Sequence, residues 1–550
     1  MPIVTVDGQQ IEVEPGATII QAADRLGVEI PRFCYHPDLR PEGNCRMCLV
    51  QVEGFARLVV ACATPVTDGM VVSSPHTSAE TAEAVQGVLE FLLINHPLDC
   101  PICDQAGECS LQDFYMHPDY GLHTSQVDVV EKVRKRKRIE LGPRIVLDSE
   151  RCVMCSRCVR FSADISGLAE LQFIHRGNRV ELIAFEDRAL EDPYAGNLAD
   201  LCPVGALTSR DFRFRRRVWH LAHTDSVCAG CSTGCNLRID HAENRIERLV
   251  PRRNPAVNSS WICDEGRLSY LRANGPDRLS QPLLSGGEEV AWPDGIRHAQ
   301  ELLATDDASG TRPLLALASA SATNESLLLF KHLVTRAFPH HRLDFRLSQE
   351  TDLVGARQDH LLRRWDKHPN TMGAFYLGFS EQPGGLDDYL QAAEAGDCVA
   401  LVLLYYPPLV GDELPPVAAA LARLLELCPH SVVLTTHRLP YLKGASLSLP
   451  VAAWAEEEGT YTNYQGTVQH SAKATEPPGA AREATAVLAD LLHTFTNHRP
   501  STAPEVLFAE LEHTVAAYRG LDYQHLPSRL ASVYPPEGRM HYGEEGFSGR

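Results

Sequence analysis

The cysteines of this chain are the residues most able to do distinctive chemistry, and there are seventeen of them. All except Cys398 and Cys428 lie before residue 264, in closely spaced groups. In a reducing compartment, closely spaced thiols favour metal ligation over disulfides. Iron-sulfur clusters and structural zinc sites both use such groups, and the spacing within each group helps to distinguish the two.

The first group has the spacing C-x10-C-x2-C-x13-C, with Gly43 just ahead of the central pair. Four thiolates from one loop and a later strand suit a [2Fe-2S] cluster, whereas structural zinc more usually shows two C-x2-C pairs. The pattern resembles plant-type ferredoxins with a longer first gap. The predicted [2Fe-2S] ligands are Cys34, Cys45, Cys48 and Cys62.

The second group, Cys100, Cys103 and Cys109, has only three cysteines and needs a fourth ligand for a [4Fe-4S] cluster. His96 precedes it and completes the pattern H-x3-C-x2-C-x5-C. A histidine at a helix end is more often a cap or a surface residue than a ligand. As a ligand, a neutral imidazole in place of a thiolate makes the site less negative and raises its potential.

The third group is the trio Cys152, Cys155 and Cys158, spaced C-x2-C-x2-C, with Cys202 ahead of a proline far along the chain. In two-cluster bacterial ferredoxins each trio has its own cysteine-proline three residues later. This chain has one trio and one distant cysteine-proline pair. The spacing therefore predicts a single [4Fe-4S] cluster.

The fourth group has the spacing C-x2-C-x3-C-x27-C and comprises Cys228, Cys231, Cys235 and Cys263. It predicts a third [4Fe-4S] cluster. A tetrahedral zinc site remains the alternative, because two close pairs of cysteines can also bind zinc.

The elements around these groups follow from hydrophobic periodicity. Alternating apolar residues flank a two-residue turn at Asp7-Gly8, and a helix is expected between Thr18 and Gly27. A second helix is expected from Ser78 to the residues before Pro97. In the rear half, buried strands at 314–317, 399–405 and 431–435 alternate with helices such as 416–427, which predicts a parallel α/β sheet.

Composition limits the other possibilities. The formal charge of -20 argues against a general nucleic-acid binder. The basic run at 132–138 is read as a solvated or subunit-facing strand or turn, with a nucleic-acid role as the alternative. No run of eighteen apolar residues occurs, so we do not expect the chain itself to span a membrane. The start at Met1 is strand-like, and we expect no export signal.

The histidine-cysteine unit after a β-grasp domain resembles three related families. They are the large iron-sulfur subunit of respiratory complex I, electron-input subunits of some NAD-linked hydrogenases, and NAD-linked formate dehydrogenases. The stretches 151–161 and 201–208 look like the complex I subunit. The other two families usually keep a paired eight-cysteine ferredoxin here, which this chain lacks.

The resemblance implies that His96 is a ligand and that the chain relays single electrons in an NADH:quinone oxidoreductase. The implied path runs through the [2Fe-2S] cluster, the Cys152 cluster and the His96 cluster, leaving the Cys228 cluster off the line. The implied partners are the flavin/NADH-binding subunit, its small [2Fe-2S] partner and the quinone-side hydrophilic subunits. The implied location is the cytoplasmic side of the inner (plasma) membrane, attached only through the complex. No acid, base or nucleophile is needed.

The Cys228 group and the segments 319–325 and 458–469 look like parts of molybdopterin oxidoreductases. A catalytic molybdenum enzyme is therefore a rival interpretation. We expect no molybdenum, because too little chain follows Cys263 to enclose a pterin and neither Cys398 nor Cys428 is placed as a molybdenum ligand. Both cysteines are read as small buried apolar residues.

The expected fold class is multidomain, α+β followed by α/β. The tail after Leu526 is expected to be a surface tail or a strap onto a partner. The predicted domains are a [2Fe-2S] β-grasp domain (1–77), a His/Cys-ligated [4Fe-4S] domain (78–118), a single [4Fe-4S] domain (119–218), a molybdopterin-oxidoreductase-type [4Fe-4S] module (219–275) and a degenerate molybdopterin-oxidoreductase-like α/β domain with the tail (276–550).

Overall fold

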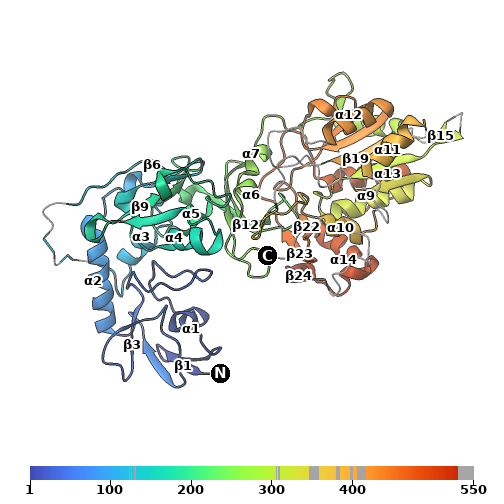
Figure 1. Ribbon diagram of the computed structural model, residues 1–550. Coiled ribbons are helices and arrows are strands. Elements are labelled where there is room, and N and C mark those ends of the chain that lie inside the picture. Colours follow the sequence, from blue (N-terminus) through green and yellow to red (C-terminus); the bar gives the residue numbers. More distant parts are fainter. Residues whose placement is uncertain are drawn as a thin grey trace, which may run out of the picture. The chain divides into compact units, whose positions relative to one another are not determined.

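The computed structural model of this chain forms two compact units, Met1–Leu221 and Ala222–Arg550. In Figure 1 the first unit runs from blue to teal and the second from green to red. Each unit has its own sheets and its own buried interior. The structure describes residues 1–122, 124–125, 127–128, 132–304, 306–307, 310–345, 358–379, 385–396, 400–405 and 417–530.

The first unit begins with the predicted β-grasp sheet, whose strand order is β2-β1-β5-β3-β4. β1 and β2 are antiparallel, and β1 pairs with β5 in parallel. The turn residues Asp7 and Gly8 both have positive φ, 49° and 82°, as a two-residue hairpin turn with matching twist requires. The strands are β1 (Ile3–Val6), β2 (Gln9–Glu12), β3 (Leu49–Val52), β4 (Val59–Val60) and β5 (Met70–Ser73).

Helix α1 (Ile19–Leu26) packs its apolar residues into the same core as the β-grasp strands. At its start the Thr18 N–H donates to the Gln21 side-chain carbonyl at 2.9 Å. Gly27 ends the helix in the left-handed conformation with φ of 72°, as predicted from the sequence.

Helix α2 (Ala79–Asn95) is the longest of the first unit and ends at the predicted ligand His96. The Ser78 side chain caps it by accepting from the Thr81 N–H at 3.3 Å. The later elements include an antiparallel sheet of order β10-β7-β6. They are η1 (Cys100–Ile102), α3 (Ser110–Tyr115), β6 (Ile139–Glu140), β7 (Ile145–Leu147), η2 (Ser149–Arg151), α4 (Arg157–Arg160), the π-turn η3 (Phe161–Ile165), β8 (Leu171–Ile174), η4 (Gly177–Arg179), β9 (Glu181–Ala184), η5 (Phe185–Asp187), α5 (Asn197–Leu201), β10 (Leu207–Ser209) and η6 (Val218–His220).

The second unit opens with an antiparallel sheet of order β11-β12-β13, followed by two short helices. The loop between β11 and β12 and the start of the first helix contain the fourth cysteine group. The elements are β11 (Ala222–Val227), β12 (Asn236–Ala242), β13 (Arg245–Pro251), α6 (Asp264–Leu268) and α7 (Tyr270–Ala273).

A six-stranded sheet of order β14-β21-β20-β19-β17-β18 forms the centre of the second unit. All its pairings are parallel except that of β14 with β21, so the predicted parallel α/β sheet is confirmed. Every residue of β17 is buried, as expected for a strand covered on both faces. The strands are β14 (Leu283–Leu284), β17 (Leu314–Ala318), β18 (His341–Asp344), β19 (Ala400–Tyr405), β20 (His430–Thr435) and β21 (Leu447–Pro450).

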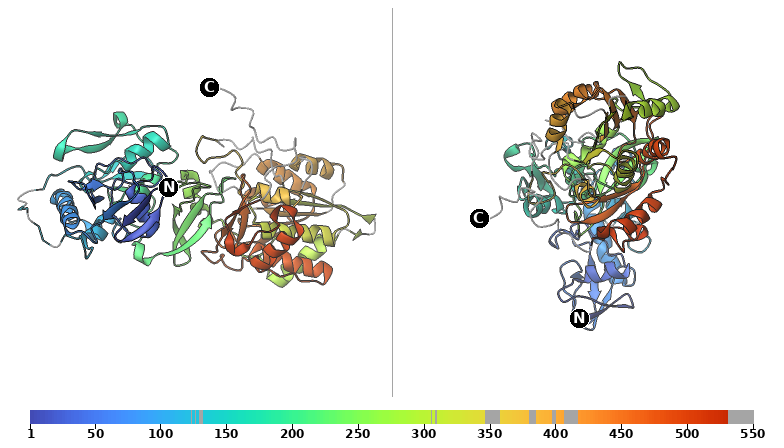
Figure 2. Two further views of the ribbon diagram at one scale, coloured as in Figure 1. Left: turned by 90° about the horizontal axis from the view of Figure 1, so that it is seen from below. Right: turned by 90° about the vertical axis from the view of Figure 1, so that its right-hand side faces the viewer.

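Helices pack on both faces of this sheet (Figure 2). One core joins Leu314 and Ala316 with α8, α9, α13 and α14, and the other joins Leu315 and Leu317 with α11 and α12. The remaining elements are α8 (Trp292–Leu302), β15 (Asp306–Asp307), β16 (Gly310–Thr311), α9 (Asn324–Ala337), α10 (Thr371–Tyr376), α11 (Gly385–Glu394), α12 (Val417–Leu427), η8 (Pro440–Leu442), β22 (Gly459–Thr462), β23 (Thr467–Ser471), α13 (Ala484–Thr496), α14 (Pro504–Thr514), η9 (Ala516–Tyr518), η10 (Tyr523–His525) and β24 (Ser528–Arg529).

Cys428 follows α12 and is fully buried, as predicted. It is also disulfide-bonded, so its interpretation as an unbonded apolar residue is wrong. Local sequence shows that a cysteine is buried, but it does not show whether a second thiol faces it. Cys398 and the tail beyond residue 530 lie outside the described residues. Among the residues that the structure describes, no helix is long and apolar enough to cross a membrane.

Candidate iron-sulfur sites

The four cysteines of the first group come together next to the β-grasp sheet. Hydrogen bonds from the Cys45 and Cys62 thiols lower the pKa of Cys34, and the Cys62 thiol lowers that of Cys48. The Cys34 N–H also donates to the Cys45 Sγ at 3.4 Å. Gly43 takes a φ of +67°, which is ordinary for glycine and strained for other residues. Four thiols close enough to exchange hydrogen bonds fit the predicted [2Fe-2S] cluster.

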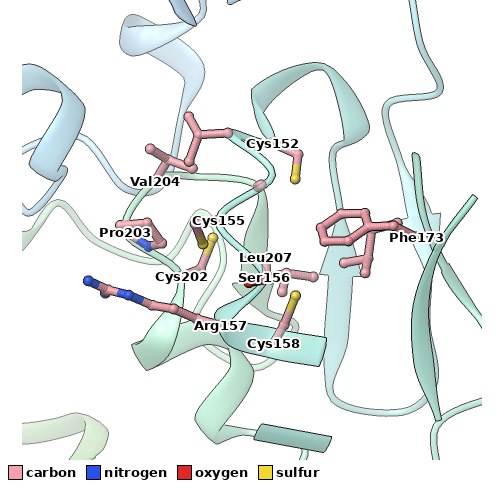
Figure 3. A pocket seen from close by; sticks show the side chains of 13 residues that line it. Cys152, Cys155, Ser156, Arg157, Cys158, Phe173, Cys202, Pro203, Val204 and Leu207 are labelled. Atoms are coloured by element: carbon pink, nitrogen blue, oxygen red, sulfur yellow. The ribbon is translucent and has the colours of Figure 1, made fainter. Parts of the chain in front are cut away.

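The third group lines a single pocket, in which the four cysteine side chains lie around a common space beside Phe173 (Figure 3). Three come from the loop into α4 and Cys202 from the end of α5. Burial raises the pKa of Cys152 to about 12 and that of Cys155 to about 11. Burial also raises the pKa of Cys158 and Cys202. Thiols must lose their protons to bind metal, so this buried donor set suits a group that brings positive charge.

The second group lies after the C-terminal end of α2. Burial raises the pKa of Cys109 to about 11, and the nearby Cys103 and Cys100 thiols add to the rise. Burial, followed by the positive charge of Arg151, lowers the pKa of His96 to about 4. The imidazole is therefore neutral near pH 7, which is the form that binds metals. Cys100 is exposed, unlike Cys103 and Cys109.

The basic run at 132–138 has a role near this group that the sequence did not reveal. The Lys132 Nζ donates to the carbonyls of Leu93, Ile94 and His96, each at 2.9 Å, at the end of α2 where carbonyls lack helical partners. Lys137 pairs with Asp99 at 2.5 Å. The run is thus partly engaged inside the first unit and helps to fix the residue that precedes Pro97. No local sequence signal pairs a lysine with a helix end 36 residues earlier.

Helix α4 connects the first and third groups. Arg160 is 2% exposed, and its guanidinium donates to the carbonyls of Cys34 and Cys155. Arg157 donates to the Tyr35 carbonyl at 2.6 Å. Two arginines therefore join the loop of the [2Fe-2S] ligands to the loop of the third group.

A backbone hydrogen bond connects the third and second groups. The N–H of Ser110, which follows Cys109, donates to the carbonyl of Pro203, which follows Cys202, at 3.0 Å. Residues next to ligands of two groups are thus in direct contact. The three groups of the first unit form a continuous series in the order first, third, second.

The fourth group lies in the second unit, between β11, β12 and α6. The Cys228 N–H donates to the Cys235 carbonyl at 2.8 Å, and the Gly266 N–H donates to the Cys263 Sγ at 3.3 Å. Burial raises the pKa of Cys228 to about 12, and the positive charge of Lys367 opposes this rise. Cys231 is buried with the others.

Two glycines test whether these donor sets fit iron-sulfur clusters. A Cβ added at Gly205 would lie 2.2 Å from the Cys103 Sγ, and one at Gly266 would lie 2.8 Å from the Cys228 Sγ. Only a residue without a side chain allows backbone and sulfur to approach so closely. Such cradles, together with sets of thiols and one imidazole, fit cluster ligation at these sites.

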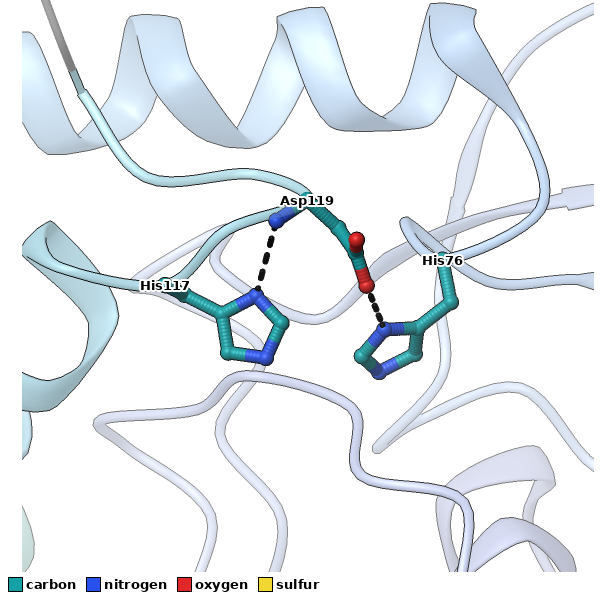
Figure 4. Close-up of side chains that lie close together, drawn as sticks. All are labelled: His76, His117 and Asp119. Carbon is teal, nitrogen blue, oxygen red and sulfur yellow. Dashed lines mark hydrogen bonds and ion pairs between the residues drawn. The ribbon is translucent and has the colours of Figure 1, made fainter.

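A further cluster of polar side chains, His76, His117 and Asp119, has potential ligand atoms within 4.8 Å of one another (Figure 4). The His76 Nδ1 lies 2.7 Å from an Asp119 carboxylate oxygen, and its Nε2 lies 2.8 Å from the Glu29 carbonyl. Both partners are acceptors, so both ring nitrogens must donate and His76 is charged. Although partial burial works against it, the hydrogen bond to Asp119 raises the pKa of His76. This arrangement is an ion pair within the first unit.

The two segments that look like pterin-binding loops bind each other inside the second unit. The Asn324 side-chain amide donates to the Thr460 and Thr462 hydroxyls at 2.9 and 3.1 Å. Glu325 accepts from the Thr460 N–H at 2.8 Å, and the Tyr518 hydroxyl donates to Asn324 at 3.1 Å. All five side chains are buried. The polar groups at the start of α9 therefore have partners from this chain.

Five family models match successive stretches of the chain, and together they define an iron-sulfur protein of ferredoxin-like and molybdopterin-oxidoreductase-like domains. This confirms the predicted fold class. The models describe a 2Fe-2S iron-sulfur cluster binding domain (3–77), the NADH-ubiquinone oxidoreductase-G iron-sulfur binding region (86–125), the ferredoxin-like domain of NADH-quinone oxidoreductase subunit 3 (142–208), the molybdopterin oxidoreductase Fe4S4 domain (221–275) and molybdopterin oxidoreductase (422–494).

The predicted resemblance to the large iron-sulfur subunit of complex I, NADH-quinone oxidoreductase, is also confirmed. The chain is 39% identical to that subunit of Streptomyces coelicolor over 361 residues, which is 64% of this chain and 42% of the relative. It is 40% identical to that of Rickettsia conorii over 337 residues, 60% of this chain and 48% of the relative. The chain thus spans less than half the length of these relatives. A solved NAD+-reducing [NiFe]-hydrogenase chain, in the H2-reduced state, is 31% identical, covers 40% of this chain and 91% of its own length, and has a TM-score of 0.35.

Proposed function

We propose that this chain is an electron-relay subunit of an NADH:quinone oxidoreductase. It would receive single electrons that originate at a flavin on a neighbouring subunit and pass them toward the quinone site. Its similarity to subunits named for NADH-quinone oxidoreductase supports this assignment. The chain itself contributes ligands and their surroundings, and no substrate site of its own is proposed.

The proposed ligand sets follow the four cysteine groups. Cys34, Cys45, Cys48 and Cys62 would hold one [2Fe-2S] cluster, and three [4Fe-4S] clusters would be held by the sets beginning at His96, Cys152 and Cys228. When bound, such clusters take up and release single electrons. We propose the same five-domain division as above, with boundaries after residues 77, 118, 218 and 275.

The contact series in the first unit is the observation that carries the proposal. Arg160 touches the carbonyls of Cys34 and Cys155, and Ser110 beside Cys109 bonds to Pro203 beside Cys202. Electron transfer between protein sites requires that they lie close together. The series supports a relay from the [2Fe-2S] site through the Cys152 site to the His96 site.

The His96 site is the proposed exit of this relay. Cys100 is exposed, and it lies between Leu98, which is 91% exposed, and Ile102, which is 62% exposed. Apolar residues around an exposed ligand favour contact with another protein. The proposed partners are the flavin/NADH-binding subunit and its small [2Fe-2S] subunit on the input side, and the quinone-side hydrophilic subunits on the output side.

We place the chain in the hydrophilic arm of the complex, on the cytoplasmic side of the inner membrane, with membrane contact only through the complex. The Cys228 site is proposed to lie off the line and to serve assembly. We also propose that the second unit holds no molybdenum. The buried hydrogen bonds among Asn324, Glu325, Thr460 and Thr462 support this, because they occupy the polar groups of the pterin-like loops.

The decisive experiment substitutes His96→Ala and records electron paramagnetic resonance spectra of the assembled complex. We expect one [4Fe-4S] signal to vanish or weaken while the [2Fe-2S] signal remains, and NADH-to-quinone electron flow to fall. Glu505→Ala, an exposed change in the second unit, is the control. Unchanged spectra and electron flow in His96→Ala would overturn both the ligand assignment and the proposed exit.

Metal analysis separates this function from its rivals. Iron-sulfur ligation predicts brown protein with roughly fourteen irons per chain. Colourless protein with about four zincs per chain would instead establish a structural scaffold. Stoichiometric molybdenum or tungsten, or a pterin that copurifies with the chain, would establish a catalytic molybdopterin enzyme.

A further inference from the structure

A segment of the α/β domain lies directly against the Cys228 site. The segment is residues 358–370, and we call it the covering segment. Its Leu362 carbonyl accepts from the Thr233 hydroxyl at 2.6 Å and from the Cys231 thiol at 3.9 Å. Its Asp366 carbonyl accepts from the Ser232 N–H at 2.9 Å. Three successive residues of the ligand loop are therefore bound by a segment more than 120 residues away in the sequence.

The covering segment brings buried positive charge to this site. Lys367 and Arg363 are each 9% exposed, and both form ion pairs with Glu265. The Lys367 Nζ lies 3.0 Å from the Glu265 carboxylate. Glu265 follows the ligand Cys263 by two residues.

Lys367 consequently lies between two ligand-bearing stretches. Its neighbour Asp366 binds the loop that holds Cys231, and its own side chain binds Glu265 beside Cys263. An ordinary surface lysine would be solvated and screened. A lysine held with little water around it exerts a stronger field on its surroundings.

This placement has a direct electrostatic consequence for a bound cluster. A cluster held by four thiolates is negatively charged and becomes more negative when it gains an electron. A nearby cation stabilises the reduced form more than the oxidised form and so raises the reduction potential, and a nearby anion does the reverse. Lys367 and Glu265 therefore act in opposite directions on the same site.

We propose that Lys367, positioned by Glu265, raises the reduction potential of the cluster held by Cys228, Cys231, Cys235 and Cys263. Lys367 binds no iron and acts through its charge, as a positioning and tuning residue. The inference rests on the proposed [4Fe-4S] ligation at this site. It adds that the α/β domain, through the covering segment, controls the electron affinity of the module that precedes it.

The test is a redox titration of the assembled complex, followed by the electron paramagnetic resonance signal of the Cys228 cluster. That signal is identified first as the one lost in Cys231→Ser. We expect Lys367→Met to shift its midpoint potential to a more negative value and Lys367→Arg to restore it largely. Glu265→Gln should shift it to a more positive value. Lys473→Met, which removes a lysine paired with Glu476 and Glu483, is the control and should leave it unchanged.

Opposite shifts in Lys367→Met and Glu265→Gln support the proposal, because loss of a merely structural ion pair would not reverse sign with the charge removed. Unchanged potentials, or shifts in the same direction, overturn it. If Lys367→Met loses the cluster, the sign of the shift in Glu265→Gln decides alone. Absence of any signal dependent on Cys231 in the unaltered complex would instead refute the cluster assignment at this site, and the proposed relay of the first unit would still stand.

Discussion

In the first unit, three predicted sites built from distant segments are joined by contacts between residues next to their ligands, whereas the second unit has one local cysteine module and a closed polar interior. Arg160 and the Ser110–Pro203 hydrogen bond connect sites in the first unit. In the second unit, Asn324 and Glu325 use their polar groups on Thr460 and Thr462. The difference indicates that one unit is arranged for transfer between sites and the other for internal stability and docking.

The largest expected effect compares one ligand from each unit. Cys155→Ser should reduce NADH-to-quinone electron flow per assembled complex to background, because the Cys152 site is in the middle of the proposed series. Cys231→Ser should lower the yield of assembled complex more than the flow per complex. Both quantities are measured by quantifying the purified complex and assaying quinone reduction. Loss of electron flow in correctly assembled Cys231→Ser complex would break the distinction between the units.

The next effect concerns the arginine that joins two sites. Arg160→Leu should lower the stability of the first unit by about 3 kcal/mol, because buried carbonyls of Cys34 and Cys155 lose a charged donor. The urea concentration at which half of the visible absorption is lost measures this change. Arg160→Lys keeps the charge but not the planar fork, so only part of the loss should be recovered.

An exposed arginine provides the matched control for that change. Arg188 has a side chain that is 77% exposed and pairs with Glu186. Arg188→Leu should have almost no effect, since exposed ion pairs contribute little. Equal losses for Arg160→Leu and Arg188→Leu would show that Arg160 has no special role between the sites.

A smaller effect should appear as a pH dependence of the second unit. Burial raises the pKa of Glu325 to about 7 from its ordinary value of 4.5. The folded state therefore binds a proton more tightly than the unfolded state, and stability falls as pH rises from about 4.5 to 7, by up to about 3 kcal/mol. Glu325→Gln should flatten this part of the profile of unfolding free energy against pH. Glu476→Gln, an exposed change, should leave the slope as it is.

The smallest expected effect is that of the His76–Asp119 ion pair in the first unit. The pKa of His76 is raised in the folded state, so its stabilisation is fully present below the unfolded value of 6.5 and is lost as pH rises through the folded value. His76→Gln and Asp119→Asn should each remove this fading contribution. A double-mutant cycle of melting temperatures at pH 6 and pH 8.5 measures it, and a coupling that does not weaken at the higher pH would contradict the charged state of His76.

Local patterns in the sequence carried a large part of the fold. The Asp7-Gly8 turn, the Ser78 cap, the Gly27 stop and the parallel strands of the rear half all depend on residues close together in the chain. Cysteine spacing likewise predicted a set of thiols that does share one pocket, the Cys152 group. These features could be predicted because their causes are local.

The surroundings of the sites could not be predicted, because they depend on tertiary contacts between remote residues. Arg160 contacts a carbonyl 126 residues away, and Lys132 caps a helix end that precedes it by 36 residues. The covering segment with Lys367 has no motif of its own. The disulfide of Cys428 belongs to the same class, since pairing depends on which thiol the fold brings near.

The exposure of Cys100 has a consequence for handling the protein. Of the fifteen free cysteines that the structure describes, it is the one classed as exposed, while the other cysteines of its group are buried. Dissolved oxygen and peroxide attack accessible sulfur first. Air should therefore damage the His96 site of the isolated chain before the others, and a bound partner would protect it. Anaerobic purification of the intact complex is the condition under which all four sites can be counted.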